Sequence, residues 1–158
     1  MLMKSQELDN KKQKAQDKLR QIEVRLNEGT WANLWYWGYQ ISNADILDID
    51  EMNVDKIVDE IKICFANDKY SKDDLLKYDY ADKFKRAIVY YSKKQSFDKG
   101  IDLAEYAIQS GLTLPAESKS FEERIDTLLK KKERQCGKYD SESYNTHSIL
   151  TGKDIASS

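Results

Sequence analysis

The stretch from Tyr80 to Ser110 reads YADKFKRAIVYYSKKQSFDKGIDLAEYAIQS, and its pattern of apolar residues decides the fold. Apolar residues recur every three or four positions in both halves, which is the spacing of one face of a helix. Those residues are Phe84, Ala87, Ile88 and Tyr91 in the first half, and Ile101, Ala104 and Ile108 in the second. The pattern predicts helices over Tyr80–Lys94 and Asp98–Ser110, the second capped by Ser96 or Asp98 and stopped by Gly111.

The short connection between these two helices predicts a helical hairpin. The spacing of its aromatic and small residues is similar to one tetratricopeptide unit. A shift of about 34 residues, the length of that unit, gives no second copy, and a stable array needs about three. We therefore expect a single hairpin with repeat-like packing, not a solenoid.

Helical signals extend in both directions from this hairpin. Ser5–Asn27 is rich in good helix formers and has a narrow apolar seam, and Gly29 ends it. Asn53–Asn67 is a clear amphipathic helix. Ser71-Lys-Asp-Asp74 resembles a helix start, and Ser120-Phe-Glu-Glu123 has the capping-box pattern that opens a last helix.

Composition agrees with an all-α protein. Among 158 residues there are six glycines and one proline, too few for the many turns of a sandwich or barrel. We expect a long basic N-terminal helix over residues 1–29, a helical core domain over 30–136 and a disordered tail over 137–158. The polar N-terminus and the lack of long apolar runs predict a cytoplasmic protein without a membrane segment.

The sequence offers poor material for catalysis. His147 is the only histidine and lies in the polar tail, where it cannot be oriented as a base. Cys64 and Cys136 fit no metal-binding spacing and are expected to be free thiols. The acidic segment Asp45–Glu60 lacks the ligand and glycine positions of a calcium loop, and we interpret it as a solvated or docking surface. No catalytic residue, cofactor or metal is expected.

Binding is the better-supported class of function. With 26 basic and 28 acidic residues the chain is nearly neutral, so contact with nucleic acid requires a local patch. Two further basic groups occur over residues 83–94 and 130–134, but the best candidate for phosphate contacts is the basic group of the N-terminal helix. Its members are Lys11, Lys12, Lys14, Lys18 and Arg20.

All three tryptophans lie within seven residues, at Trp31, Trp35 and Trp37. Large aromatics at helical spacing either anchor a core or form contacts between subunits. They also stack on bases, but Thr30–Ala44 contains no lysine or arginine to support that role. We therefore expect a core or oligomer contact here.

The segment from Phe97 to Pro115, FDKGIDLAEYAIQSGLTLP, resembles the GpM-type small terminase subunit of temperate tailed bacteriophages. The likeness covers Phe84–Arg124 best. It implies a non-catalytic subunit of the host-cell cytoplasm, assembled as a ring, that binds double-stranded phage DNA. It also implies a partner, the large terminase subunit, which carries the ATPase and nuclease activities of genome packaging.

Two other functions are left open. One is a helical-hairpin adaptor that binds protein without binding DNA. The other is a metal-dependent endonuclease subunit, which matches a label sometimes given to the family and would use the carboxylates of Asp45–Asp59.

Overall fold

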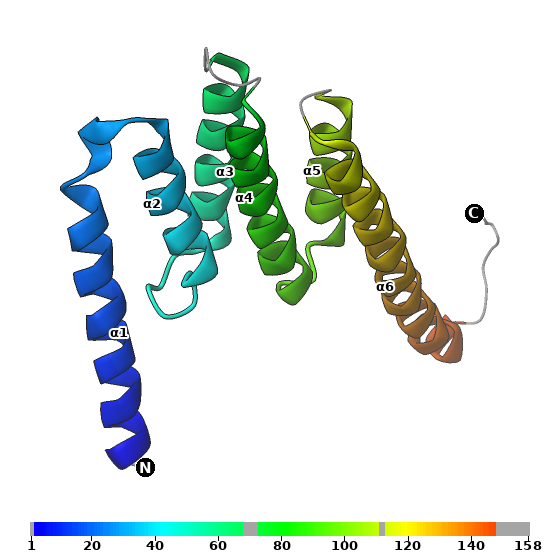
Figure 1. Cartoon of the computed structure of the whole chain (residues 1–158). Coiled ribbons are helices and arrows are strands. Elements are labelled where there is room, and N and C mark those ends of the chain that lie inside the picture. The colour runs from blue at the N-terminus through cyan, green and yellow to red at the C-terminus, as the bar shows by residue number, and fades with distance from the viewer. Residues whose placement is uncertain (1, 68–72, 111–112, 148–158) are drawn as a thin grey trace.

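A computed structural model describes residues 2–67, 73–110 and 113–147, with side chains from 5 to 136 within those ranges. The described chain is all-α, as the sequence predicts. It forms six α-helices and one short 3-10 helix, which follow one another in a row in Figure 1. They are α1 (Leu2–Glu23), η1 (Leu26–Glu28), α2 (Thr30–Ser42), α3 (Glu51–Asn67), α4 (Asp74–Lys93), α5 (Phe97–Gln109) and α6 (Pro115–His147).

The helices from α2 to α6 pack in two layers. Helices α2, α4 and α6 contact one another in sequence, so that α4 lies between the other two. Helix α3 packs against α2 and α4, and α5 packs against α4 and α6. The expected hairpin of α4 and α5 is present, with a short connection between Lys93 and Phe97. Helix α1 packs on α2 at the end of the row.

The core is centred on aromatic rings from four of these helices. Tyr80 and Phe84 of α4 meet Phe65 of α3, with ring centroids 4.2 Å and 6.0 Å apart. Tyr106 of α5 packs against Phe84 at 5.9 Å, and Phe121 of α6 is fully buried. Edge-on and tilted rings at such distances contribute about 1 kcal/mol beyond the area they bury. Two of these rings belong to α4, which has eight buried residues.

The amphipathic helix predicted over Asn53–Asn67 is confirmed as α3. It buries Val54, Val58, Ile61 and Phe65 toward the core. Asp50 precedes it, and one of its carboxylate oxygens accepts a 2.9 Å hydrogen bond from the backbone N–H of Asn53. An acidic cap at this end opposes the positive pole of the helix dipole.

Two predicted helix starts differ from the structure. Helix α4 is capped by Asp73, whose side chain accepts a 2.8 Å hydrogen bond from the N–H of Leu75; Ser71 lies outside the described residues. Helix α6 begins at Pro115, so Ser120 lies inside the helix and caps nothing. Proline has a fixed φ and no N–H to satisfy, so it is the favoured residue at the first helical position, and here it outweighs the capping-box pattern.

The other predicted boundaries are partly observed. Helix α1 ends at Glu23, and the short turn η1 leads to Gly29, whose φ of 139° favours glycine. Ser96 precedes α5, but its side chain makes no capping hydrogen bond. Gly111 lies outside the described residues. The backbone of α6 continues to His147, past the Gly137 at which we expected the helical core to end.

Candidate functional site

The structure brings two groups of candidate residues together where α1 packs on α2. The Trp31 and Trp35 rings are stacked with their centroids 6.1 Å apart. Lys18 of α1 places its Nζ 5.1 Å from the centroid of the Trp35 ring. The guanidinium of Arg25 lies 4.9 Å from the Trp31 centroid and 5.9 Å from that of Trp35. Both positions satisfy the geometry of a cation–π contact.

These contacts supply the bases that the tryptophan segment itself lacks. They come from α1 and from the turn after it, which fold back along α2. The Trp31 side chain remains 40% exposed, and Lys18 and Arg25 are also exposed. The aromatic–cationic surface, defined as Trp31, Trp35, Lys18 and Arg25, is therefore open to a ligand. Arg25 was not among the predicted binding residues, because its neighbours in the sequence give no sign that it reaches both rings.

The five basic residues of α1 that were predicted to contact DNA divide into two sets. Lys11, Lys14 and Lys18 are three, four or seven positions apart, so they share one helix face. Within the part of the chain that the structure describes, Lys11 and Lys14 have no acidic partner within 4 Å and are exposed. They extend the aromatic–cationic surface along α1.

The other two predicted DNA contacts are engaged within the chain. Lys12 pairs with Asp48, and this hydrogen bond raises the pKa of Lys12. Arg20 pairs with Asp17, whose pKa is lowered by that hydrogen bond. An anion would have to compete with these carboxylates. Lys12 and Arg20 are thus weaker candidates for phosphate contacts than Lys11 and Lys14.

Trp37 lies apart from the other two tryptophans. It packs against the main hydrophobic core, which agrees with the core interpretation for this residue. Its neighbour Gly38 allows α2 to approach α4 closely, because an added Cβ would stand only 2.7 Å from the stem of Lys83. One aromatic stretch therefore serves both packing and an exposed surface.

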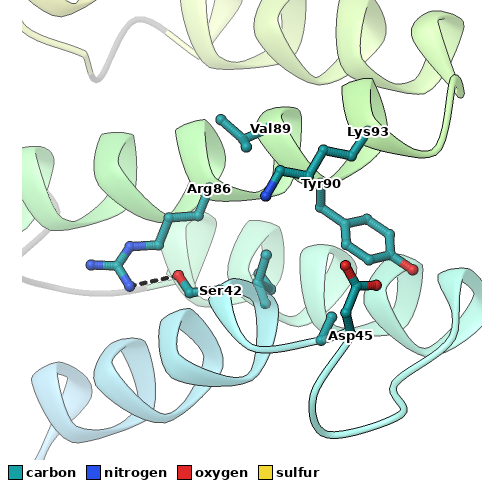
Figure 2. A pocket seen from close by; sticks show the side chains of 8 residues that line it. Ser42, Asp45, Arg86, Val89, Tyr90 and Lys93 are labelled. Carbon is teal, nitrogen blue, oxygen red and sulfur yellow. Dashed lines mark hydrogen bonds between the residues drawn. The ribbon is translucent and has the colours of Figure 1, made fainter. Parts of the chain in front are cut away.

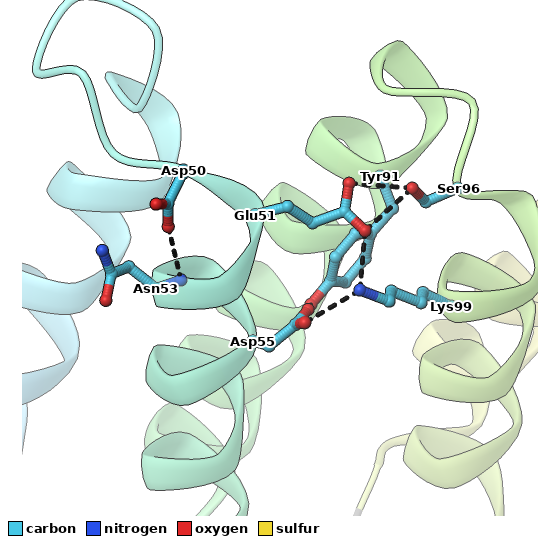
Figure 3. A network of polar contacts seen from close by, with 7 residues as sticks. All are labelled: Asp50, Glu51, Asn53, Asp55, Tyr91, Ser96 and Lys99. Carbon is cyan, nitrogen blue, oxygen red and sulfur yellow. Dashed lines mark hydrogen bonds and ion pairs between the residues drawn. The ribbon is translucent and has the colours of Figure 1, made fainter.

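The acidic segment of α3 faces α5, where it forms a closed polar network (Figure 3). Lys99 of α5 donates to Glu51 at 2.6 Å and to Asp55 at 2.8 Å. Glu51 also accepts from Ser96 at 2.9 Å, and Asp55 accepts from Tyr91 at 2.6 Å. The hydrogen bond from Lys99 lowers the pKa of Glu51. These carboxylates therefore join α3 to the hairpin of α4 and α5.

No group of three or more histidine, cysteine, aspartate or glutamate residues gathers to hold a metal ion among the residues that the structure describes. A metal site in the acidic segment would require Asp48 and Asp50. Asp48 instead pairs with Lys12, and Asp50 accepts the hydrogen bond from the N–H of Asn53 that caps α3. Cys64 is partly buried and Cys136 is exposed, and neither forms a disulfide.

A second cationic surface lies on α4, opposite the network of Figure 3. Between Lys83 and Lys94 the sequence has five basic residues and no acidic one. Figure 2 shows part of this surface, where Arg86 and Lys93 extend over a pocket between α2 and α4. Arg86 is held by Ser42 at 2.8 Å and by Asp82 at 2.9 Å. A second pocket, between α4 and α6, adds Arg124 and Lys131 to the same side.

The structure thus unites two basic groups that are far apart in the sequence, around residues 83–94 and 130–134. Sequence reasoning identified both groups but not their proximity, which depends on α4 and α6 lying side by side. None of the described helices combines the length and the apolar content needed to cross a bilayer. Comparison with models of known families, with curated proteins and with solved structures found no match to this chain.

Proposed function

We propose that this chain is a DNA-binding small subunit of a phage terminase, and that the exposed face of α1 contacts the DNA backbone. The observation that carries the DNA contact is the aromatic–cationic surface together with Lys11 and Lys14. Four cations lie along one side of α1 and its following turn, two of them placed over tryptophan rings. In the described ranges Lys11, Lys14 and Lys18 have no acidic partner within 4 Å, whereas Arg25 also pairs with Glu28 at 3.1 Å. Cations that lie in a row with few acidic partners are what binding to phosphates requires.

The tryptophan rings have a defined part in this proposal. A free lysine or arginine loses about 2 kcal/mol of rotamer entropy when it is fixed on a phosphate. Rings that already restrict Lys18 and Arg25 reduce that loss. The packaging role rests on a different feature, the likeness of Phe97–Pro115 to the GpM-type subunits. In the structure this segment contributes α5 and the connection to α6.

A salt series of gel shifts tests the DNA contact. We expect the full chain to bind a 30-base-pair duplex, and the logarithm of its association constant to fall linearly with the logarithm of salt concentration. The double variant Lys11→Glu/Lys14→Glu should bind at least tenfold more weakly. Its slope should be shallower by about 2, since each phosphate contact contributes about 0.9.

The control changes the same amount of charge elsewhere. Lys56 on α3 and Lys119 on α6 are exposed and have no acidic partner within 4 Å in the described parts of the chain. The double variant Lys56→Glu/Lys119→Glu should keep at least half of the wild-type affinity. Equal losses in the two double variants, or no binding of wild type at low salt, would contradict the proposed contact.

The packaging role has its own test. If a large terminase subunit is encoded beside this chain, the two should co-purify and the pair should retain duplexes that carry the packaging site over random ones. If the chain binds DNA without sequence preference and does not co-purify with the large subunit, the packaging role is contradicted while the DNA contact still stands.

A further inference from the structure

The groove between α4 and α6 has an apolar floor and a cationic rim. Ile88, Val89 and Leu128 form the floor of an open pocket of about 350 Å³. The rim carries three basic side chains and two hydroxyls, from Lys93, Arg124, Lys131, Ser92 and Thr127. Its lining contains no acidic residue. Lys85, paired with Glu117 at 2.6 Å, ties α4 to α6 nearer the start of both helices.

The cations of this rim differ from most of the bases around them. Lys85, Lys94 and Lys132 each pair with a carboxylate within the chain. In the described ranges Lys93, Arg124 and Lys131 have no acidic partner within 4 Å, and Lys131 donates a hydrogen bond to the Ser92 hydroxyl at 2.9 Å. The Nε of Arg124 is buried and has no hydrogen-bond partner in the part of the chain that the structure describes. Lys93 and Lys131 are exposed, so their ammonium groups can receive acceptors from a partner.

The surface continues across α4 into the pocket of Figure 2, a second hollow of about 190 Å³. Val89 and Lys93 line both pockets, and Val89 is 41% exposed. The buried Tyr90, whose hydroxyl has no hydrogen-bond partner among the described residues, also lines this second hollow. Unlike the first pocket, this hollow is also lined by an acidic residue, Asp45, which pairs with Lys94 at 3.1 Å.

We propose that the pocket between α4 and α6, called the α4 groove from here on, docks an acidic amphipathic helix of a partner protein. Helices bind in grooves by placing apolar residues at positions i, i+3, i+4 and i+7 on the floor. Here Val89, Ile88 and Leu128 would receive that apolar face, while glutamate or aspartate at its edges pairs with Lys93, Arg124 and Lys131. A polyphosphate backbone satisfies the cations but covers the aliphatic floor with charge, so the chemistry of the groove favours a polypeptide. The proposal concerns a different surface from the DNA contact on α1 and does not depend on it.

The test measures fluorescence anisotropy of two labelled 16-residue helical peptides with the full chain. Both carry leucine at i, i+3, i+4 and i+7; one has glutamate at the flanking positions and the other has glutamine. We expect the glutamate peptide to bind at least tenfold more tightly. Lys93→Glu/Lys131→Glu should reduce its affinity at least tenfold, and the control double variant Lys56→Glu/Lys119→Glu should change it less than twofold.

A second pair of variants tests the apolar floor. Val89→Glu should reduce peptide affinity at least tenfold, whereas Val24→Glu, at a site that is 82% exposed, should leave it unchanged. Circular dichroism would verify that all variants keep their helical content. Equal binding of the two peptides, or equal effects of the matched variants, would overturn the proposal.

Competition with DNA decides the remaining alternative. If a duplex displaces the peptide and its own binding depends on Lys93 and Lys131, the groove is a DNA surface and the docking proposal fails. If DNA binding instead depends only on Lys11 and Lys14, while the peptide depends on Lys93 and Lys131, both proposals stand. If DNA binding does not depend on Lys11 and Lys14, the proposed DNA contact fails, but the proposal for the α4 groove still stands.

Discussion

The hydroxyl of Tyr91 donates a 2.6 Å hydrogen bond to the carboxylate of Asp55, which links α4 to α3 across the core. Tyr91 is buried, and burial together with this carboxylate raises the pKa of its phenol. The phenol therefore stays protonated and remains a donor. Asp55 is also held by Lys99, so the carboxylate has two donors from two helices.

Replacement of Tyr91 by phenylalanine should remove this bond without leaving a cavity. We expect Tyr91→Phe to lower the free energy of unfolding by about 1.5–3 kcal/mol, since a hydrogen bond to a charged group contributes about that much. Urea denaturation followed by circular dichroism measures it. Tyr78→Phe, at a site 52% exposed, is the matched control and should change stability by less than 0.5 kcal/mol. A loss of similar size in both variants would contradict the structural role of the bond.

The pKa of Glu51 gives a pH dependence with a definite sign. The hydrogen bond from Lys99 lowers that pKa from its ordinary value of 4.5, so the folded state binds this proton less readily than the unfolded state does. The resulting stability is present above pH 4.5 and is lost as the pH falls through the lower folded value. Glu51→Gln should therefore be less stable than wild type at pH 7, and the difference should shrink below pH 4. Melting curves at both pH values check this, and a difference independent of pH would refute it.

The cap of α4 is open to a direct test. Asp73→Ala should cost about 1 kcal/mol of stability, which is the usual effect of losing a side-chain cap. Asp126→Ala removes the same charge inside α6, at an exposed position, and should be neutral or slightly stabilising because alanine favours helix. Chemical denaturation of the two variants distinguishes the capping contribution from a general effect of charge.

Gly38 marks the closest approach of α2 to α4 and yields a fourth prediction. Gly38→Ala gains about 0.5–1 kcal/mol of helix preference, but the new methyl would meet the Cδ and Cε of Lys83 at 2.7 Å. Lys83 is only 8% exposed and its Nζ lies 3.0 Å from Asp82, so its stem has little room to move. Crowding a packed site costs about 1–3 kcal/mol, and we expect a net loss of about 1 kcal/mol.

A second substitution makes this prediction sharp. Shortening the crowding side chain should remove the clash, so Gly38→Ala/Lys83→Ala should be more stable than the sum of the two single variants implies. A thermal-denaturation cycle over the four proteins measures this coupling. Strict additivity would mean that α2 and α4 are not in contact at Gly38.

Local patterns predicted much of this fold. The amphipathic period of Asn53–Asn67 became α3, and the pattern of Tyr80–Ser110 became the hairpin, because in both segments one apolar face is buried against the core. Helix starts were harder to predict. Several residues with capping chemistry lie near each start, and the choice between Ser120 and Pro115 depends on how far the preceding connection extends.

The surfaces were less predictable than the helices. The basic residues of α1 and the tryptophans were both identified, yet their pairing through Lys18 and Arg25 depends on α1 folding back on α2. The α4 groove needs Lys93 and Lys131 on helices that are separated by α5. Contacts between residues so far apart leave no periodic signal in a single sequence.

The position of α4 between α2 and α6 has a consequence for the order in which the protein opens. Helix α4 is in contact with four other helices, whereas α1 packs on the α2 end of the row alone. Local unfolding follows such differences in packing, since each opening breaks only the contacts of the part that opens. Backbone amides of α1 should therefore exchange with deuterium first and those of α4 last. The helix proposed to contact DNA would then unfold locally while the helices at the centre of the row remain folded.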